Sequence, residues 1–95
     1  MGKIEFTWDT RKATINQKKH KVSFEEARSA FFDENALVFN DPDHSQDEDR
    51  FILLGTSFNL RTLVVCHCYR ENDTVIRIFS ARKADKQEQQ HYLGA

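Results

Sequence analysis

Three β-type runs stand close together in the second half of the chain, and they constrain the fold more than any other feature. They cover residues 50–55, 61–69 and 74–81 and are rich in branched and aromatic side chains. The links between them, residues 56–59 and 70–73, are short and contain many turn-forming residues. Consecutive strands joined by such short links predict an antiparallel meander.

The chain opens with the patterns of a strand and a helix. Residues 3–8 alternate polar and apolar side chains, which predicts a half-buried strand. Asp9 or Thr10 can cap a helix that continues to about residue 19. Helical spacing places three side chains of this segment on one basic face: Lys12, Asn16 and Lys19.

A second helix is indicated by Ser23 and Glu26, which have the spacing of a capping box. In that motif the Ser23 hydroxyl accepts from the Glu26 amide, and the Glu26 side chain reaches back to the Ser23 amide. The apolar stripe of this helix is expected to consist of Phe24, Ala27, Phe31 and Phe32.

The remaining patterns complete the expected fold. Residues 36–39 predict a short strand, residues 41–49 a polar loop, and residues 84–92 a weakly amphipathic helix. A chain of 95 residues can support one small core, so we expect a single domain over residues 1–95. The predicted class is α+β, with two N-terminal helices packed on a mostly antiparallel sheet and a short C-terminal helix.

Charge is distributed unevenly, although the formal net charge is only −1. Residues 1–32 and residues 50–95 each carry +3, whereas residues 33–49 contain seven acidic residues and no basic one. Basic flanks can attract an anionic polymer such as RNA, with the acidic stretch as a partner contact; solvated surface is the simpler alternative. No apolar run approaches the roughly 18 residues that cross a bilayer, and residues 1–6 lack a secretory signal. We therefore expect no membrane contact and a cytoplasmic location.

Common metal and nucleotide motifs are missing. Cys66 and Cys68 stand two residues apart in a β-type run, where they are too close along one strand for an easy disulfide, and no second ligand pair completes a zinc site. The acidic loop departs from a calcium-binding loop at Gln46 and Ile52, where Gly and Glu are needed. The chain also lacks a Gly-rich phosphate loop. We expect no metal and no cofactor.

Two polar residues interrupt the apolar runs and are candidates for chemistry. Arg77 can clamp a phosphate with two parallel N–H donors, or it can form an ordinary ion pair on the solvated sheet face. His67 can be a packed residue or a base. A three-residue hairpin loop would pair His67 with Arg77, whereas a four-residue loop of residues 70–73 would pair it with Ile76.

Together these residues carry a resemblance to a known family. The chain is similar to the BrnT family of bacterial type II toxins in its opening motif, Phe6-x-Trp8-Asp9-x-x-Lys12-x-x-x-Asn16-x-x-Lys19-His20-x-Val22-Ser23-Phe24-Glu25-Glu26-Ala27. Later segments are also similar to the family: Asp41-Pro42-Asp43-His44-Ser45, Glu48-x-Arg50-Phe51, Leu54-Gly55-x-Ser57, Leu63-Val64-Val65-x-His67 and Ile76-Arg77-Ile78-x-Ser80-Ala81-Arg82-Lys83-Ala84.

The resemblance implies a fold like that of the RelE ribonuclease toxins and a metal-independent RNA cleavage that stops translation. It also implies a cognate antitoxin of ribbon-helix-helix type, through which the toxin oligomerises. A non-catalytic module that binds nucleic acid or protein is the alternative.

On this hypothesis, a base removes the ribose 2′-hydroxyl proton and cationic side chains stabilise the transition state. Arg77 and Arg82 are assigned to phosphate clamping, and His67 to acid–base work. Four further residues are assigned to RNA binding: Lys19, His20, Arg50 and Tyr92.

Overall fold

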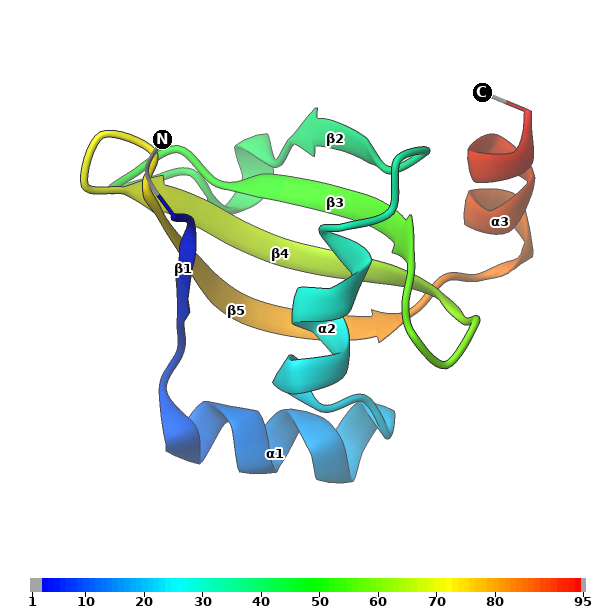
Figure 1. Cartoon of the computed structure of the whole chain (residues 1–95), viewed down its shortest axis with the longest axis horizontal. Helices are drawn as coiled ribbons and strands as arrows, with labels where there is room; N and C mark the ends of the chain where they lie inside the picture. The colour runs from blue at the N-terminus through cyan, green and yellow to red at the C-terminus, as the bar shows by residue number, and fades with distance from the viewer. Residues whose placement is uncertain (1–2, 95) are drawn as a thin grey trace.

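The computed structural model describes residues 3–94 (Figure 1). Its strands are β1 (Glu5–Thr7), β2 (Leu37–Asn40), β3 (Phe51–Thr56), β4 (Thr62–Arg70) and β5 (Val75–Lys83). Its helices are α1 (Thr10–His20), α2 (Phe24–Ala30) and α3 (Lys86–Leu93), and a 3-10 turn, η1 (Pro42–His44), lies in the acidic loop. The predicted order of elements and the α+β class are therefore confirmed.

One five-stranded sheet, in the order β1-β5-β4-β3-β2, organises the molecule. The pairs β2–β3, β3–β4 and β4–β5 are antiparallel, and the last two form the predicted meander. Strand β1 pairs parallel with the beginning of β5, over residues 75–77. The sheet is thus mostly antiparallel, with one parallel edge strand.

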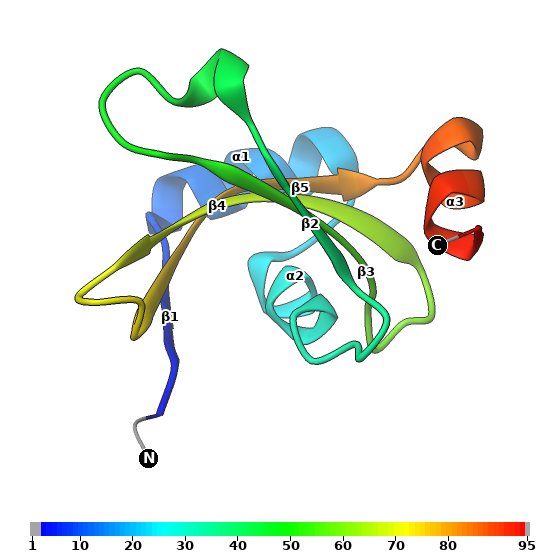
Figure 2. The ribbon, with the colours of Figure 1, turned by 90° about the horizontal axis from the view of Figure 1, so that it is seen from above.

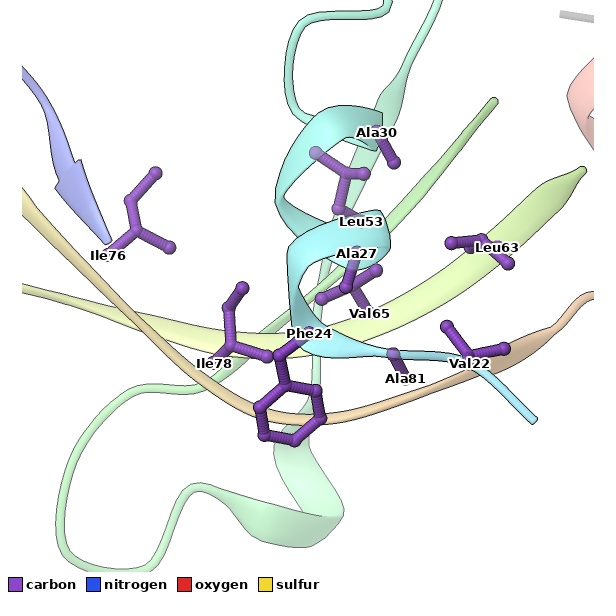
Figure 3. Packing of buried hydrophobic residues seen from close by; sticks show 10 residues of the cluster. All are labelled: Val22, Phe24, Ala27, Ala30, Leu53, Leu63, Val65, Ile76, Ile78 and Ala81. Atoms are coloured by element: carbon purple, nitrogen blue, oxygen red, sulfur yellow. The ribbon is translucent and has the colours of Figure 1, made fainter. Parts of the chain in front are cut away.

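Helix α2 packs across one face of the sheet and forms the main core with it (Figure 3). The core residues are Val22, Phe24, Ala27, Ala30, Leu53, Leu63, Val65, Ile76, Ile78 and Ala81. Helix and sheet approach closely at Gly55, where a Cβ atom would lie 2.8 Å from the carbonyl oxygen of Ala30. A larger residue at this position would push α2 away from β3.

Helix α1 lies along β5, beyond the three residues that pair with β1 (Figure 1). The buried side chain of Asn16 joins the two elements. Its Nδ2 donates to the carbonyl oxygen of Ala81 at 2.9 Å and to that of Val22 at 3.0 Å, and its Oδ1 accepts from the Ala81 amide at 3.1 Å. Asn16 therefore satisfies backbone groups of β5 that a neighbouring strand would otherwise pair.

The second face of the sheet is partly covered by α3. A smaller apolar cluster lies there, formed by Leu54, Val64 and Ala84 with Leu37, Ile52 and Tyr92 packed against it. The Tyr92 hydroxyl donates to Asp33 and accepts from the Thr56 hydroxyl at 3.0 Å. Seen from above, α2 lies on one side of the sheet and the loop that carries η1 on the other (Figure 2). We call the side away from α2 the open face.

Three local expectations are corrected by the structure. Ser23 caps α2 by accepting from the Glu26 amide at 3.0 Å, but the Glu26 side chain turns inward to Ser57 and Arg61 instead of completing a capping box. Phe32 lies outside the apolar stripe, with 73% of its surface exposed, because α2 ends at Ala30.

The hairpin between β4 and β5 adopts neither of the two predicted registers. Its loop consists of residues 71–74, so Arg70 pairs with Val75 and His67 pairs with Ile78; the register shifts only beyond this point, between Cys66 and His67. The shift is a β-bulge, which places one extra residue, Phe79, on β5.

A search of residues 3–94 for a helix long and apolar enough to cross a membrane finds none.

The Glu26–Arg61 pair allows a test of the fold. Glu26 is 3% exposed; its carboxylate accepts from Arg61 Nε at 2.9 Å and from the Ser57 hydroxyl at 2.7 Å. The Arg61 hydrogen bonds lower the pKa of Glu26 below its usual value of 4.5. The charged pair therefore stabilises the fold above that pH, and the contribution is lost as the pH falls through the lowered pKa.

We expect Glu26→Gln to lower the free energy of unfolding near pH 7 by about 2 kcal/mol, less than for a fully buried pair because Arg61 is partly exposed. Urea unfolding at pH 7 and pH 3 measures the difference, which should shrink at the lower pH. Glu25→Gln, on the exposed side of the same helix, is the matched control. A difference that stays constant between the two pH values would contradict this account.

A candidate active site on the open face of the sheet

An open depression of about 490 Å³ lies on the open face, between α1, the η1 loop and the central strands. Its lining consists of Lys12, His20, Asp41, His44, Arg50, Ile52, Val64, Cys66, Phe79, Ser80, Ala81 and Arg82. A smaller hollow shares Lys12, His20, Phe79 and Ser80 with it and continues along α1 to Lys19. The two hollows together follow the basic face of α1.

The β-bulge shapes the floor of the depression. Across β4 and β5, Cys66 pairs with Ser80 and His67 with Ile78, so Phe79 has no partner in the ladder. As a result the successive side chains of Phe79 and Ser80 both line the depression. Bulges commonly redirect a side chain in this way beside an active site.

Arg50 lies over this aromatic floor. Its guanidinium carbon is 3.8 Å from the centre of the Phe79 ring, and the ammonium nitrogen of Lys12 is 5.9 Å from the same ring. Stacking on an aromatic face orients a guanidinium and leaves its N–H edge available for an anion. None of the salt bridges found within residues 3–94 involves Arg50 or Lys12.

Arg82, at the end of β5, is held by α3. Its two terminal nitrogens donate to the two carboxylate oxygens of Glu88, each at 2.8 Å. This pairing raises the pKa of Arg82 and lowers that of Glu88. A phosphate that binds Arg82 must therefore compete with Glu88 or share the guanidinium with it.

The wall opposite α1 carries an Asp–His pair that our sequence analysis did not assign to the site. Nδ1 of His44 lies 3.1 and 3.0 Å from the two carboxylate oxygens of Asp41, which is 6% exposed. The Cys66 thiol donates to Asp41 at 3.6 Å; burial first, and then Asp41, raise its pKa to about 11. The i,i+3 spacing of Asp41 and His44 around Pro42 was the signal that could have identified the pair.

The predicted site residues separate into two groups. His20, Arg50 and Arg82 line the depression, and Lys19 lines the hollow that continues from it. Arg77 lies farther along β5, near Asp9. The hydrogen bond from the Lys12 amide is the main cause of the lowered pKa of Asp9, and Arg77 adds a small contribution.

His67 and Tyr92 lie apart from this cluster. His67 is fully buried on the α2 side, where its ring contacts Phe31 and Tyr69 and Nδ1 lies 3.1 Å from the Val65 carbonyl oxygen. Burial lowers its pKa, which favours the neutral form. The Tyr92 hydroxyl is occupied by Asp33 and Thr56. Neither side chain lines the depression.

Cationic side chains outnumber carboxylates in the lining of the depression, with Lys12, Arg50 and Arg82 against Asp41 alone. Within residues 3–94, no three His, Cys, Asp or Glu side chains converge in an arrangement that could hold a metal ion. Cationic side chains beside a stacked aromatic ring are instead suited to a nucleic acid, whose phosphates and bases they can both contact.

The fold matches that of a bacterial ribonuclease toxin. The crystal structure of the Brucella abortus ribonuclease toxin BrnT superimposes with a TM-score of 0.65, covering 90% of this chain and 100% of that one at 23% sequence identity. A sequence comparison with curated proteins finds no match.

The family model described as "Ribonuclease toxin, BrnT, of type II toxin-antitoxin system" matches residues 8–88. The chain therefore belongs to the BrnT family, which confirms the resemblance seen in its sequence. It is a ribonuclease toxin, rather than a non-catalytic binding module, and family membership implies a cognate antitoxin.

The stacked arginine allows a test of the site. If the depression holds RNA phosphates, Arg50→Ala should weaken binding roughly tenfold, equivalent to about 1.4 kcal/mol. It should also reduce the salt dependence of log K by about 0.7, the value for one phosphate contact on a single strand. Fluorescence anisotropy with an uncleavable 2′-deoxy oligonucleotide at several salt concentrations measures both.

Arg28→Ala is the matched control, because Arg28 is exposed on α2, on the other side of the sheet. If the two variants lost affinity equally, the RNA would not bind specifically in the depression.

Proposed function

We propose that this toxin is a metal-independent endoribonuclease that cleaves RNA in the depression on the open face and thereby stops translation. One observation carries the proposal: Lys12, Arg50 and Arg82 converge on a hollow whose floor contains the Phe79 ring. Such a site can bind the sugar–phosphate backbone through its cations and a base through its ring.

The reaction requires no metal in principle. The ribose 2′-hydroxyl, once deprotonated, attacks the adjacent phosphate, and negative charge accumulates on the phosphoryl oxygens in the transition state. Guanidinium and ammonium groups stabilise that charge where a metal ion would otherwise do so. Arginine stays protonated, so Arg50 and Arg82 act as electrostatic groups and the base must be a different residue.

Individual roles follow from position. Arg82 clamps the phosphate at the α3 end of the depression, and Arg50 does so above Phe79. Lys19 and His20 guide the backbone along α1, and Arg77 contacts a more distant phosphate from the same strand. His67 and Tyr92 are given structural roles in this proposal, because the first is buried and the hydroxyl of the second is already bonded.

We expect the purified protein to cleave a mixed-sequence RNA in the presence of excess EDTA. The reason is that the proposed transition state is stabilised by side-chain cations alone. The rate of cleavage with and without chelator, followed on a gel, measures the dependence. Loss of cleavage in EDTA with recovery on adding a divalent metal would show that the reaction needs that ion.

The cognate antitoxin is proposed to be of ribbon-helix-helix type and to neutralise the toxin by covering the depression. A partner that supplies carboxylates can pair with the cations that would otherwise bind RNA. The open rim of the depression suits a polymer-sized partner better than a small molecule. Oligomerisation then occurs through the antitoxin, and the toxin released from it acts in the cytoplasm, where translated RNA is present.

We expect the product of the adjacent small gene to co-purify with the toxin and to prevent RNA cleavage. Because it binds only the folded toxin, it should also raise the temperature of unfolding. Toxin carrying Arg50→Ala and Arg82→Ala together should bind this partner more weakly, whereas Arg28→Ala should bind like the parent. Tight binding that leaves cleavage unaffected would contradict neutralisation at the depression.

A further inference from the structure

We propose that His44 is the general base of the RNA cleavage reaction and that Asp41 is the residue that positions it. The proposal rests on the function proposed above, since it assigns a role within that site. It starts from the contact between Nδ1 of His44 and both carboxylate oxygens of Asp41, at 3.1 and 3.0 Å.

This contact determines which ring nitrogen faces the substrate. A carboxylate can only accept, so Nδ1 carries the proton and donates it to Asp41. Nε2 of the neutral ring is then the acceptor, and it is the nitrogen free to take a proton from a substrate. The His44 side chain is 65% exposed and lines the depression, whereas the Asp41 side chain is 8% exposed behind it.

The loop around the pair is rigid enough to hold this geometry. The Ser45 hydroxyl donates to the Asp41 carbonyl oxygen at 2.7 Å and accepts from the Arg50 amide at 2.9 Å. The Asp41 amide in turn donates to the Arg50 carbonyl oxygen at 2.8 Å. These bonds hold His44 and Arg50 on the same short stretch of backbone, so that both can contact the same phosphate in the depression.

The other histidines of the chain are less suited to the task. His67 is fully buried in the core, and His91 lies on α3 against Phe39, outside the depression. His20 lines the depression on the α1 side. Among the salt bridges found within residues 3–94, the only one that involves a histidine is that of His44 with Asp41. His44 is therefore the histidine with an orienting carboxylate and access to the site.

The chemistry balances without a further reactant. Nε2 of His44 takes the proton of the ribose 2′-hydroxyl while the 2′-oxygen forms a bond to phosphorus. The bond from phosphorus to the 5′-oxygen breaks, and that oxygen leaves with the bonding electron pair and takes a proton from water. The products are a 2′,3′-cyclic phosphate and a 5′-hydroxyl end, and the imidazolium returns its proton to solvent. The cations of Arg50 and Arg82 stabilise the phosphoryl oxygens.

The neighbouring groups fix the electrostatic setting of His44. Its own loop presents Asp41, Asp43, Asp47 and Glu48, and the residue before β3 presents Arg50. The remaining cations of the depression face it from α1 and β5, namely Lys12, His20 and Arg82. The Cys66 thiol beside Asp41 stays protonated at neutral pH, because its pKa is raised to about 11. It therefore leaves the Asp41 charge to His44 and is not the base.

The test compares His44→Ala, His44→Gln and Asp41→Asn with the parent and with His91→Ala as a surface control. Single-turnover cleavage of one RNA oligonucleotide is followed in EDTA from pH 5 to pH 9, and affinity is measured with the 2′-deoxy analogue. Circular dichroism identifies the variants that fold.

We expect both His44 variants to cleave at least about 100-fold more slowly, with affinity changed less than about threefold. We expect the cleavage rate of the parent to rise with pH and this rise to disappear in both His44 variants, and added imidazole should partly restore cleavage by His44→Ala. Asp41→Asn should lower the single-turnover cleavage rate without weakening the affinity for the 2′-deoxy analogue and should shift the pH profile, whereas His91→Ala should behave like the parent.

Two results would overturn the inference, and they are distinguishable. If the parent cleaves RNA and a folded His44 variant cleaves at a similar rate with the same pH profile, His44 is not the base, although the proposed function stands. If the parent cleaves no RNA under any condition, the proposed function fails and the role of His44 falls with it.

Discussion

The side-chain amide of Asn16 is the contact on which the arrangement of the open face depends. Strand β1 pairs with only the first three residues of β5, so the backbone of β5 beyond them needs another partner. Asn16 supplies it by exchanging two hydrogen bonds with Ala81, and its remaining donor binds the Val22 carbonyl oxygen at the turn into α2. All three hydrogen-bonding groups of a buried amide are thus directed at backbone that must be satisfied. Because α1 is fixed along β5, its basic face lies beside the β-bulge at Phe79.

As a result, one face of the sheet forms the core and the other forms the candidate site. On the α2 side, apolar residues and the buried Glu26–Arg61 pair stabilise the fold. On the open face, α3 covers one end and the depression occupies the remaining space between α1 and the η1 loop. Alternation along β4 keeps the two apart, since Val64 and Cys66 point to the depression whereas Val65 and His67 point to α2. Arg82 connects the depression to the C-terminal helix, because the Glu88 carboxylate that orients it also completes the capping box of α3.

Much of this fold could be predicted from local patterns, and the departures have physical causes. Caps at Asp9 and Ser23, alternation in the strands and short links gave the order of elements, because each signal acts over a few residues. The Glu26 side chain could not be placed, since its partner Arg61 lies 35 residues away. The hairpin register was missed because it depends on a loop with left-handed backbone at residues 71–73, a conformation that ordinary residues rarely adopt. In the candidate site, His20, Arg50 and Arg82 do come together, whereas His44 was overlooked in a segment predicted to be only a polar loop.

RNA is proposed to bind on the open face, over the β-bulge, and the measurement that tests this claim most directly is a map of the bound surface. Amide NMR shifts of isotope-labelled toxin can be followed as an uncleavable 2′-deoxy oligonucleotide is added. We expect the largest changes at Arg50, Cys66, Phe79 and Ser80, which line the depression. Largest changes along α2 and at the turn between β3 and β4, with the depression unaffected, would contradict the claim.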